Sequence, residues 1–315
     1  MKQGTVKAIC VSEKRGTKKK EIQEATFVED FGIEQDAHAG NWHRQVSLLS
    51  DEKIEAFRSK GAEVVYGDFG ENVIIDGFDF RSLPVGTRFH CNDIILEMTQ
   101  IGKECHSHCQ IYHTMGDCIM PREGVFAKVV KGGTMHVGDT VTMEEVKKDR
   151  PFQAAVITLS DSGVRGERVD ESGPCIVEIL KENGYEVVET VLIADEQKVL
   201  ERHLKRLADM RQVDLVLTTG GTGFSPRDTT PEGTLAVADR LAPGIAEAMR
   251  AYSMTITKRA MLSRAQSVIR KNTLIVNLPG SKKAVKESLE YIITELGHGL
   301  DVLRGDVSNC ARKDD

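Results

Sequence analysis

The 315-residue sequence has few aromatic residues, few prolines and no long hydrophobic run. Phe, Trp and Tyr make up 5% of the chain, with a single tryptophan, Trp42, and there are eight prolines. No apolar stretch approaches the ~20 residues of a membrane-spanning helix, and none near the start has signal-peptide length. Hydrophobic residues (40%) and charged residues (29%) are at ordinary globular levels. We therefore expect a cytoplasmic protein of two domains that is neither fibrous nor membrane-embedded.

The sequence also lacks a block of basic charge. Its formal net charge is -6, and the short run 18–20 of lysines is followed by Glu21 and Glu24. We therefore expect no binding to nucleic acid or to an anionic membrane. The seven cysteines are an odd number without an export signal, so they do not predict a disulfide scaffold.

The charged segment 144–151, which ends in Pro151, separates two different patterns. It predicts a domain over 1–145, a linker over 146–151 and a domain over 152–315. In the first domain, short β-rich segments at 5–11, 71–75 and 94–98 alternate with turn signals, and one helix is expected over 51–60 with Ser50 or Asp51 as its cap. We predict a mostly-β barrel for this domain.

The second domain alternates strands with helices. Apolar strands are expected at 154–159, 185–191, 214–219 and 273–278, and helices at 172–183, 196–211 and from about 284, with Ser172 as the N-cap of the first. Fully apolar strands alternating with helices predict a three-layer α/β domain with a mainly parallel sheet.

Polar residues follow four of these strands, and ligands of open parallel sheets bind at the carboxyl ends of the strands. The residues are Ser160, Asp161, Asp170 and Ser172 after the first strand, Asp195 after the second, Gly220, Gly221, Thr222, Gly223, Arg227 and Asp228 after the third, and Pro279, Gly280 and Ser281 after the last. Glycines allow backbone N–H groups to converge on an anion, and a loop before a helix is a second anion site. Two such loops suit two phosphates, with Asp195 and Asp228 placed to hold Mg²⁺.

Simpler interpretations remain open for each of these residues. The glycine loop could be only a tight turn, and it does not match the P-loop pattern. Asp195 could cap the next helix, Asp228 could belong to a turn, and Ser281 could be only an N-cap. Their joint placement at strand ends favours a functional site.

The second half resembles the molybdopterin-binding MogA/MoaB family. The resemblance covers 152–305 and rests on the motifs at 160–161, 170–174, 218–223, 227–232, 262–264 and 278–281. It implies a molybdopterin adenylyltransferase, which transfers AMP from ATP to the terminal phosphate of molybdopterin and releases pyrophosphate.

The resemblance also implies a role for each motif residue. Asp195 and Asp228 would be the catalytic carboxylates and tentative Mg²⁺ ligands. The substrate and nucleotide contacts would be Ser160, Asp161, Asp170, Ser172, Gly220, Gly221, Thr222, Gly223, Arg227, Ser263, Pro279, Gly280 and Ser281. Lys282 stands where relatives often carry proline. A homotrimer formed through this domain is implied as well.

A cysteine and histidine cluster is the most unusual feature of the first half. Cys105, Cys109 and Cys118 fall within 14 residues, with His106, His108 and His113 among them. Three interpretations remain open: buried thiols with surface histidines, a structural zinc site with atypical spacing, or a reactive thiolate activated by Lys103 or a histidine.

The first half resembles MOSC domains. The resemblance rests on the segments 32–40, 44–49, 67–73, 83–87 and 137–141. It implies a β-barrel with a cysteine that binds sulfur or the metal of the molybdenum cofactor. Cys105 matches that cysteine best, Cys118 is the second candidate and His38 is expected nearby. The pyridoxal-phosphate lyase domain of the cofactor sulfurase is absent, so that cofactor is not expected.

Together these features predict a protein of molybdenum or tungsten cofactor biosynthesis. Its second domain would adenylylate molybdopterin with Mg-ATP, and its first would bind cofactor, sulfur or metal through cysteine. Two alternatives remain: a non-catalytic molybdopterin or metal carrier or sulfur-transfer module, and a module that stores or senses molybdate, tungstate or zinc. Other proteins of cofactor biosynthesis would be its partners.

Overall fold

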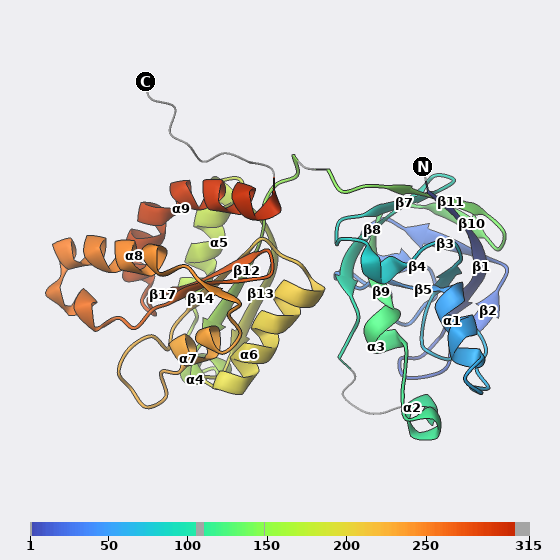
Figure 1. The fold of residues 1–315 in the computed structure, drawn as a ribbon, viewed down its shortest axis with the longest axis horizontal. Coiled ribbons are helices and arrows are strands. Elements are labelled where there is room, and N and C mark those ends of the chain that lie inside the picture. Colours follow the sequence, from blue (N-terminus) through green and yellow to red (C-terminus); the bar gives the residue numbers. More distant parts are fainter. Residues whose placement is uncertain (1, 105–109, 148, 306–315) are drawn as a thin grey trace. The chain divides into compact units, whose positions relative to one another are not determined.

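The chain divides into two compact units, Met1–Lys147 and Lys148–Asp315 (Figure 1). The computed structural model describes residues 2–104, 110–147 and 149–305, so Cys105 and Cys109 lie outside the described residues. Within these ranges no helix has the length and apolar character needed to cross a membrane.

The N-terminal unit is built mainly from β-strands. They are β1 (Gln3–Val11), β2 (Lys20–Ile22), β3 (Glu24–Val28), β4 (Gly32–Ile33), β5 (Val46–Ser50), β6 (Val73–Ile75), β7 (Arg88–Cys91), β8 (Ile94–Ile101), β9 (Val125–Lys131), β10 (Gly133–His136) and β11 (Thr140–Glu144). The helices are α1 (Asp51–Arg58), α2 (Gln110–Met115), α3 (Met120–Glu123) and the 3₁₀ turn η1 (Phe80–Ser82).

Seven of these strands close a barrel, which confirms the predicted β-barrel. The order is β11-β7-β8-β9-β5-β6-β1, and β11 pairs back onto β1 through Gln3–Thr142 and its neighbours. β2 adds to β1, and β10, β3 and β4 form a small separate sheet. The strand expected at 71–75 covers Val73–Ile75, and Asn72 before it bonds Ser47 and Cys10 of the neighbouring strands through both its backbone and its side chain.

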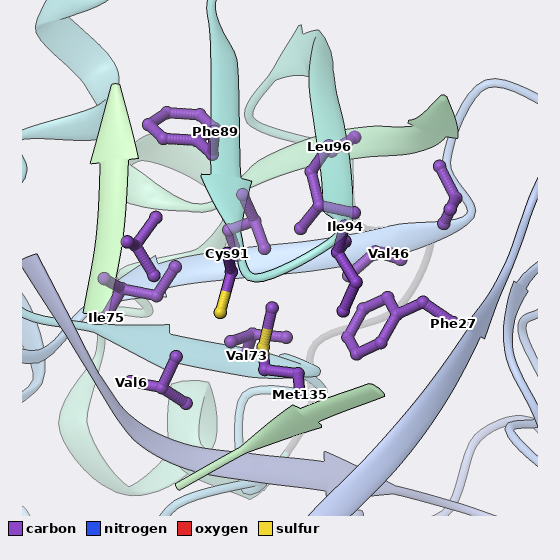
Figure 2. Close-up of a cluster of buried hydrophobic side chains, with 14 of the residues drawn as sticks. Val6, Phe27, Val46, Val73, Ile75, Phe89, Cys91, Ile94, Leu96 and Met135 are labelled. Atoms are coloured by element: carbon purple, nitrogen blue, oxygen red, sulfur yellow. The ribbon is translucent and has the colours of Figure 1, made fainter. Parts of the chain in front are cut away.

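The barrel interior is filled by alternate residues of its strands (Figure 2). Val6, Ile75, Phe89 and Leu96 are each at most 1% exposed. Cys91 belongs to this core, where burial and nearby Asp139 raise the pKa of its thiol to about 12. Packing therefore accounts for this cysteine, which is protonated at neutral pH.

The C-terminal unit alternates strands and helices. Its strands are β12 (Gln153–Leu159), β13 (Glu186–Ile193), β14 (Leu215–Thr219), β15 (Arg240–Leu241), β16 (Ser267–Arg270) and β17 (Thr273–Leu278). Its helices are α4 (Asp161–Val164), α5 (Ser172–Glu182), α6 (Gln197–Lys205), α7 (Thr230–Leu235), α8 (Pro243–Ile256) and α9 (Lys282–Arg304), with the π-helical segment η2 (Arg206–Met210) and the 3₁₀ segment η3 (Lys258–Leu262).

The α/β prediction is confirmed, and the sheet is mixed. Its order is β13-β12-β14-β17-β16-β15; the first four strands are parallel, while β16 and β15 are antiparallel additions. Along β12, Ala154 and Val156 pack in a cluster with α5, α8 and α9, whereas Ala155 and Ile157 pack in another with α6 and η2. Both sides of the central strands are therefore covered by helices.

The start of α5 differs from the prediction. Ser172 is the first helical residue rather than the N-cap, and the carboxylate of Asp170 accepts hydrogen bonds from the N–H groups of Ser172 (3.0 Å) and Gly173 (2.9 Å). An aspartate two residues before the helix reaches these orphan donors directly. The helix expected over 196–211 begins at Gln197 and continues as η2.

A buried carboxylate anchors both ends of the C-terminal unit. Asp214, whose side chain is 6% exposed, pairs with Arg150 at 2.8 Å and with Arg304 at 2.8 Å. Arg304 also lies 4.1 Å from the ring centroid of Phe152. Burial acts to raise the pKa of Asp214, but the two arginines outweigh it and lower the pKa. Arg150 of the expected linker and the end of α9 are thereby fixed to the sheet.

Candidate functional site

A cavity of about 340 Å³ lies at the carboxyl ends of β12, β13, β14 and β17. It brings together nine of the residues expected at this site: Ser160, Asp161, Asp170, Ser172, Asp195, Gly220, Gly221, Asp228 and Gly280. Arg165, Arg168, Glu171 and Lys282 also line it, and the sequence reasoning did not select them as site residues.

Asp161 and Asp195 hold each other through backbone bonds at one wall of this cavity. The N–H of Asp161 donates to the Asp195 carboxylate (2.9 Å), and the N–H of Asp195 donates to the Asp161 carboxylate (3.0 Å). Arg227 clamps Asp161 through Nε (3.0 Å) and Nη2 (2.8 Å). Asp195 therefore does not cap the following helix, whose N-cap is Glu196.

The two carboxylates differ in proton affinity. The hydrogen bonds from Arg227 lower the pKa of Asp161. Burial raises the pKa of Asp195, and the charges of Asp161 and Asp228 raise it further. Asp195 thus lies in negative potential that a bound cation would relieve.

The donor set at Asp195 and Asp228 fits Mg²⁺, which prefers carboxylate oxygens and usually retains waters and substrate phosphates as its other ligands. No group of three or more His, Cys, Asp or Glu side chains able to hold a metal occurs within 2–104, 110–147 and 149–305. A magnesium ion held here would therefore complete its coordination with phosphate and water oxygens.

The glycine turn after β14 both reverses the chain and lines the cavity. Gly220 and Gly221 have positive φ angles of 98° and 62°. A Cβ atom at Gly220 would lie 2.3 Å from the carbonyl oxygen of Leu159, and one at Gly221 would lie 2.4 Å from Oγ1 of Thr230. Only glycine meets both requirements. Gly220 and Gly221 therefore form a tight turn, and the same turn lines the cavity.

Arg264 links this loop to the Asp228 turn. It donates to the carbonyl oxygen of Gly223 (2.7 Å) and to that of Asp228, and it pairs with Glu232. The Asp228 carboxylate accepts from the N–H of Ser225 (2.9 Å), so Asp228 belongs to a turn as well as to the cavity wall. Arg264 belongs to the motif at 262–264, so the sequence already indicated it as a candidate.

Several expected site residues lie elsewhere. Thr222, Gly223, Arg227 and Ser281 do not line the cavity, and the hydroxyl of Ser281 accepts from the N–H of Ala284 (3.4 Å) as the N-cap of α9. Ser263 and Pro279 line a second cavity of about 250 Å³ beside α8, η3 and α9.

A buried asparagine behind the site was not among the residues predicted from the sequence. Asn277, which is 0% exposed, donates to the hydroxyls of Thr218 (2.9 Å) and Thr234 (2.9 Å) and accepts from the N–H of Gln266 (3.1 Å). It joins β14 and α7 to β17. A single amide inside the apolar run 273–278 was the available signal, because buried polar groups must be hydrogen-bonded.

A larger cavity of about 860 Å³ lies in the N-terminal unit. His38 and Cys118 both line it, together with Trp42, Arg44 and Lys103. The guanidinium of Arg44 lies 4.7 Å from the ring centroid of Trp42 and 5.5 Å from that of Phe126, within cation–π range of both rings. Two of the three expected barrel-site residues thus share one cavity, and the third, Cys105, lies outside the described residues.

A buried ion pair supports the loop that carries His38. Asp36 accepts from Nζ of Lys19 at 2.7 and 2.9 Å and from the N–H of Ser12 at 3.0 Å. Burial acts to raise the pKa of Asp36, but the hydrogen bonds from His38 and Lys19 outweigh it and lower the pKa. This pair could not be predicted from the sequence, because Lys19 stands within a short run of lysines.

The motif residues Glu71 and Asn72 are buried at the same cavity. Asn72 accepts from the N–H of Ser47 (3.1 Å) and donates to the carbonyl oxygen of Cys10 (3.1 Å). Glu71 is 0% exposed and accepts from the N–H of Gly67 (2.8 Å), and burial raises its pKa to about 7. Glu71 and Asn72 thus tie strands and loops together, and Asn72 also lines the cavity.

The comparisons with known proteins agree with this geometry. The family model described as "Probable molybdopterin binding domain" matches residues 155–298, and the MOSC domain model matches residues 35–142. Molybdopterin adenylyltransferase of Haemophilus influenzae is 46% identical over 151 residues, which are 47% of this chain and 77% of the relative. The Drosophila melanogaster molybdenum cofactor synthesis protein cinnamon is 37% identical over 155 residues, 49% of this chain and 26% of that protein.

Among solved structures, the molybdopterin biosynthesis enzyme MoaB of Thermus thermophilus is 44% identical, covers 49% of this chain and 97% of its own, and has a TM-score of 0.47. The sequence matches agree with the strand-end motifs of the second half and with the barrel of the first. The chain therefore belongs, through its C-terminal half, to the family of the molybdopterin adenylyltransferases, and it carries a MOSC domain in its N-terminal half.

Proposed function

We propose that the C-terminal unit adenylylates molybdopterin with Mg-ATP. A terminal phosphate oxygen of molybdopterin attacks the α-phosphorus of ATP, the bond to the β-phosphate breaks, and pyrophosphate leaves. The observation that carries this proposal is the presence of Asp195 and Asp228 beside the glycine turn in one cavity. Relatives named for this activity cover most of the unit.

The side chains around the cavity suit phosphate transfer by positioning. Asp195 and Asp228 would hold Mg²⁺, which offsets the negative charge of the phosphates. The backbone bonds between Asp161 and Asp195 fix the orientation of Asp195, and Arg227 fixes Asp161. The turn at Gly220 and Gly221 admits a phosphate close to the backbone, since no side chain stands in the way.

The test is to incubate the full chain with molybdopterin, Mg²⁺ and labelled ATP, and to measure adenylylated pterin and pyrophosphate. Asp301→Asn on α9 is the matched control, because Asp301 does not line the cavity. Product that is lost in Asp195→Asn but retained in Asp301→Asn supports the proposal. No product from the wild type, with molybdopterin still bound, would replace it with the carrier function.

We propose that the barrel cavity binds the cofactor, or its sulfur or metal, through a cysteine thiol. Cys118 and His38 share this cavity with Arg44 and Trp42, and Cys105 stays a predicted ligand. Because Trp42 is the single tryptophan of the chain, its fluorescence reports on this cavity. We expect molybdopterin to quench it in the wild type and in the control Cys175→Ala. Binding should weaken in Cys118→Ala or Cys105→Ala; unchanged binding in both would reject the cysteine role.

We also propose that the protein is a homotrimer formed through the C-terminal unit. Five large hydrophobic side chains of this unit are exposed on β15, α8 and η3: Leu241, Met254, Ile256, Met261 and Leu262. α8 and η3 pack against each other, and exposed apolar side chains on neighbouring elements are typical of protein interfaces. Sedimentation of the full chain should give three times the 34.8 kDa chain mass, and a monomer would contradict the proposal.

A further inference from the structure

The C-terminal cavity is poor in usable positive charge. Five acidic side chains line it, Asp161, Asp170, Glu171, Asp195 and Asp228, against three basic ones, Arg165, Arg168 and Lys282. Substrates that carry several phosphate charges would be repelled by such a surface. Binding them requires cations whose charge is not already offset by the protein.

Arg165 does not meet this requirement. Its guanidinium pairs with the carboxylate of Glu167 through two contacts of 2.9 Å. The charge of Arg227 is likewise offset, by its ion pair with Asp161. Within residues 149–305, by contrast, neither Arg168 nor Lys282 takes part in an ion pair.

Both residues line the cavity, and they follow the two strands that flank β14. Arg168 belongs to the loop that follows β12, and Lys282 is the first residue of α9, which follows β17. β14 lies between β12 and β17 in the sheet, and the turn at Gly220 and Gly221 follows β14. A phosphate held at the turn therefore has one uncompensated cation on each side.

We propose that Arg168 and Lys282 bind the phosphate groups of the substrates from the two sides of the glycine turn and set the affinity of the cavity for polyphosphate. The inference rests on the proposed adenylyl transfer and deepens it. The phosphates come either from ATP or from the end of the pterin, and both present the same anionic oxygens. Arg168 offers a planar fork of donors and Lys282 a point charge.

The first test measures binding of inorganic pyrophosphate to the full chain by calorimetry, with and without Mg²⁺. We expect Arg168→Ala and Lys282→Ala each to weaken binding by about fivefold or more, since each removes a charge-assisted hydrogen bond. Lys283→Ala is the matched control, because Lys283 lies next to Lys282 but outside the cavity. The control should stay within about twofold of the wild type, since the exposed ion pair of Lys283 with Glu287 contributes little. Lys282→Arg, which keeps the positive charge that Lys282→Ala removes, should bind pyrophosphate like the wild type.

The second test separates KM from kcat. Loss of a contact made equally in the ground state and the transition state raises KM and leaves kcat unchanged. A higher KM for ATP assigns the contact to the nucleotide, and a higher KM for molybdopterin assigns it to the pterin phosphate. If the wild type shows no turnover but the variants lose pyrophosphate affinity, adenylyl transfer fails while the inference stands. If the wild type turns over and the Arg168→Ala/Lys282→Ala double variant keeps its affinity and both KM values, the inference is overturned.

Discussion

The two cavities are built in different ways. In the C-terminal unit the residues that follow the strands line the cavity themselves, as Asp161, Asp195 and Gly220 do. In the N-terminal unit the motifs supply buried supports, Asp36 and Glu71, as well as residues that line the cavity, such as His38 and Arg44.

This difference follows from how each fold creates a site. Parallel strands end at one edge, so the residues after them meet without further support. A closed barrel has no such edge, and its cavity depends on loops held from beneath by buried polar groups. The barrel cavity therefore needs buried supporting residues that the strand-end cavity does not, and the following experiments test that contrast from the largest expected effect to the smallest.

Asp228→Asn should abolish the chemistry of the C-terminal cavity without unfolding it. We expect turnover to fall at least about 10³-fold, because the variant removes a charge that stabilises the reacting phosphates. Circular dichroism should match the wild type, since the amide oxygen can still accept from the N–H of Ser225. A normal rate would show that this motif residue is architectural.

Lys19→Met should damage the barrel rather than any reaction. It leaves Asp36 as a buried carboxylate without its cation, which costs roughly 3–4 kcal/mol of unfolding free energy. Urea unfolding followed by Trp42 fluorescence measures this loss in the N-terminal unit. Adenylyl transfer by the C-terminal unit should be unchanged, and a variant as stable as the wild type would contradict the supporting role of the pair.

Glu71 should make the barrel less stable as pH rises. Burial raises its pKa from 4.5 to about 7, so the folded state binds the proton more tightly than the unfolded state. Stability is then full below the unfolded pKa, declines by roughly 3 kcal/mol as pH rises through the folded pKa, and is constant above it. Glu71→Gln should reduce the pH dependence of the unfolding free energy between about pH 5 and about pH 8. Unfolding followed by Trp42 fluorescence measures it. Parallel pH profiles for the variant and wild type would reject the assignment.

Ser281→Ala should have the smallest effect and separates a cap from a ligand contact. Removing an N-cap hydroxyl costs about 1 kcal/mol of helix stability. Pyrophosphate affinity should be unchanged, because Ser281 caps α9 and does not line the cavity. A large loss of affinity with unchanged stability would return Ser281 to the binding site.

The architecture of both units could be predicted from the sequence because it depends on local patterns. Turn residues between short alternating strands indicated the barrel, and apolar strands alternating with capped helices indicated the α/β unit. The antiparallel strands β15 and β16 were not predictable in this way, since the two-residue segment Arg240–Leu241 becomes a strand only through pairing with β16.

The site residues could be predicted where their positions depend only on the ends of the strands. Asp195 and Asp228 meet because their strands share an edge, and the glycine loop could be identified by composition. Arg168 and Lys282 could not be selected, because their role depends on which neighbouring charges are already paired. The contact of the Arg44 guanidinium with the ring of Phe126 likewise joins residues far apart in sequence.

The crowding at Gly220 and Gly221 also limits how this protein can evolve. Every single replacement at either position meets a backbone conformation that residues with a side chain rarely adopt, and an atom closer than 2.5 Å to the new Cβ. Random drift therefore cannot adjust substrate preference from within the turn. New specificity must arise at the surrounding side chains, and descendants of this chain should diverge at positions such as Lys282 while both glycines stay fixed.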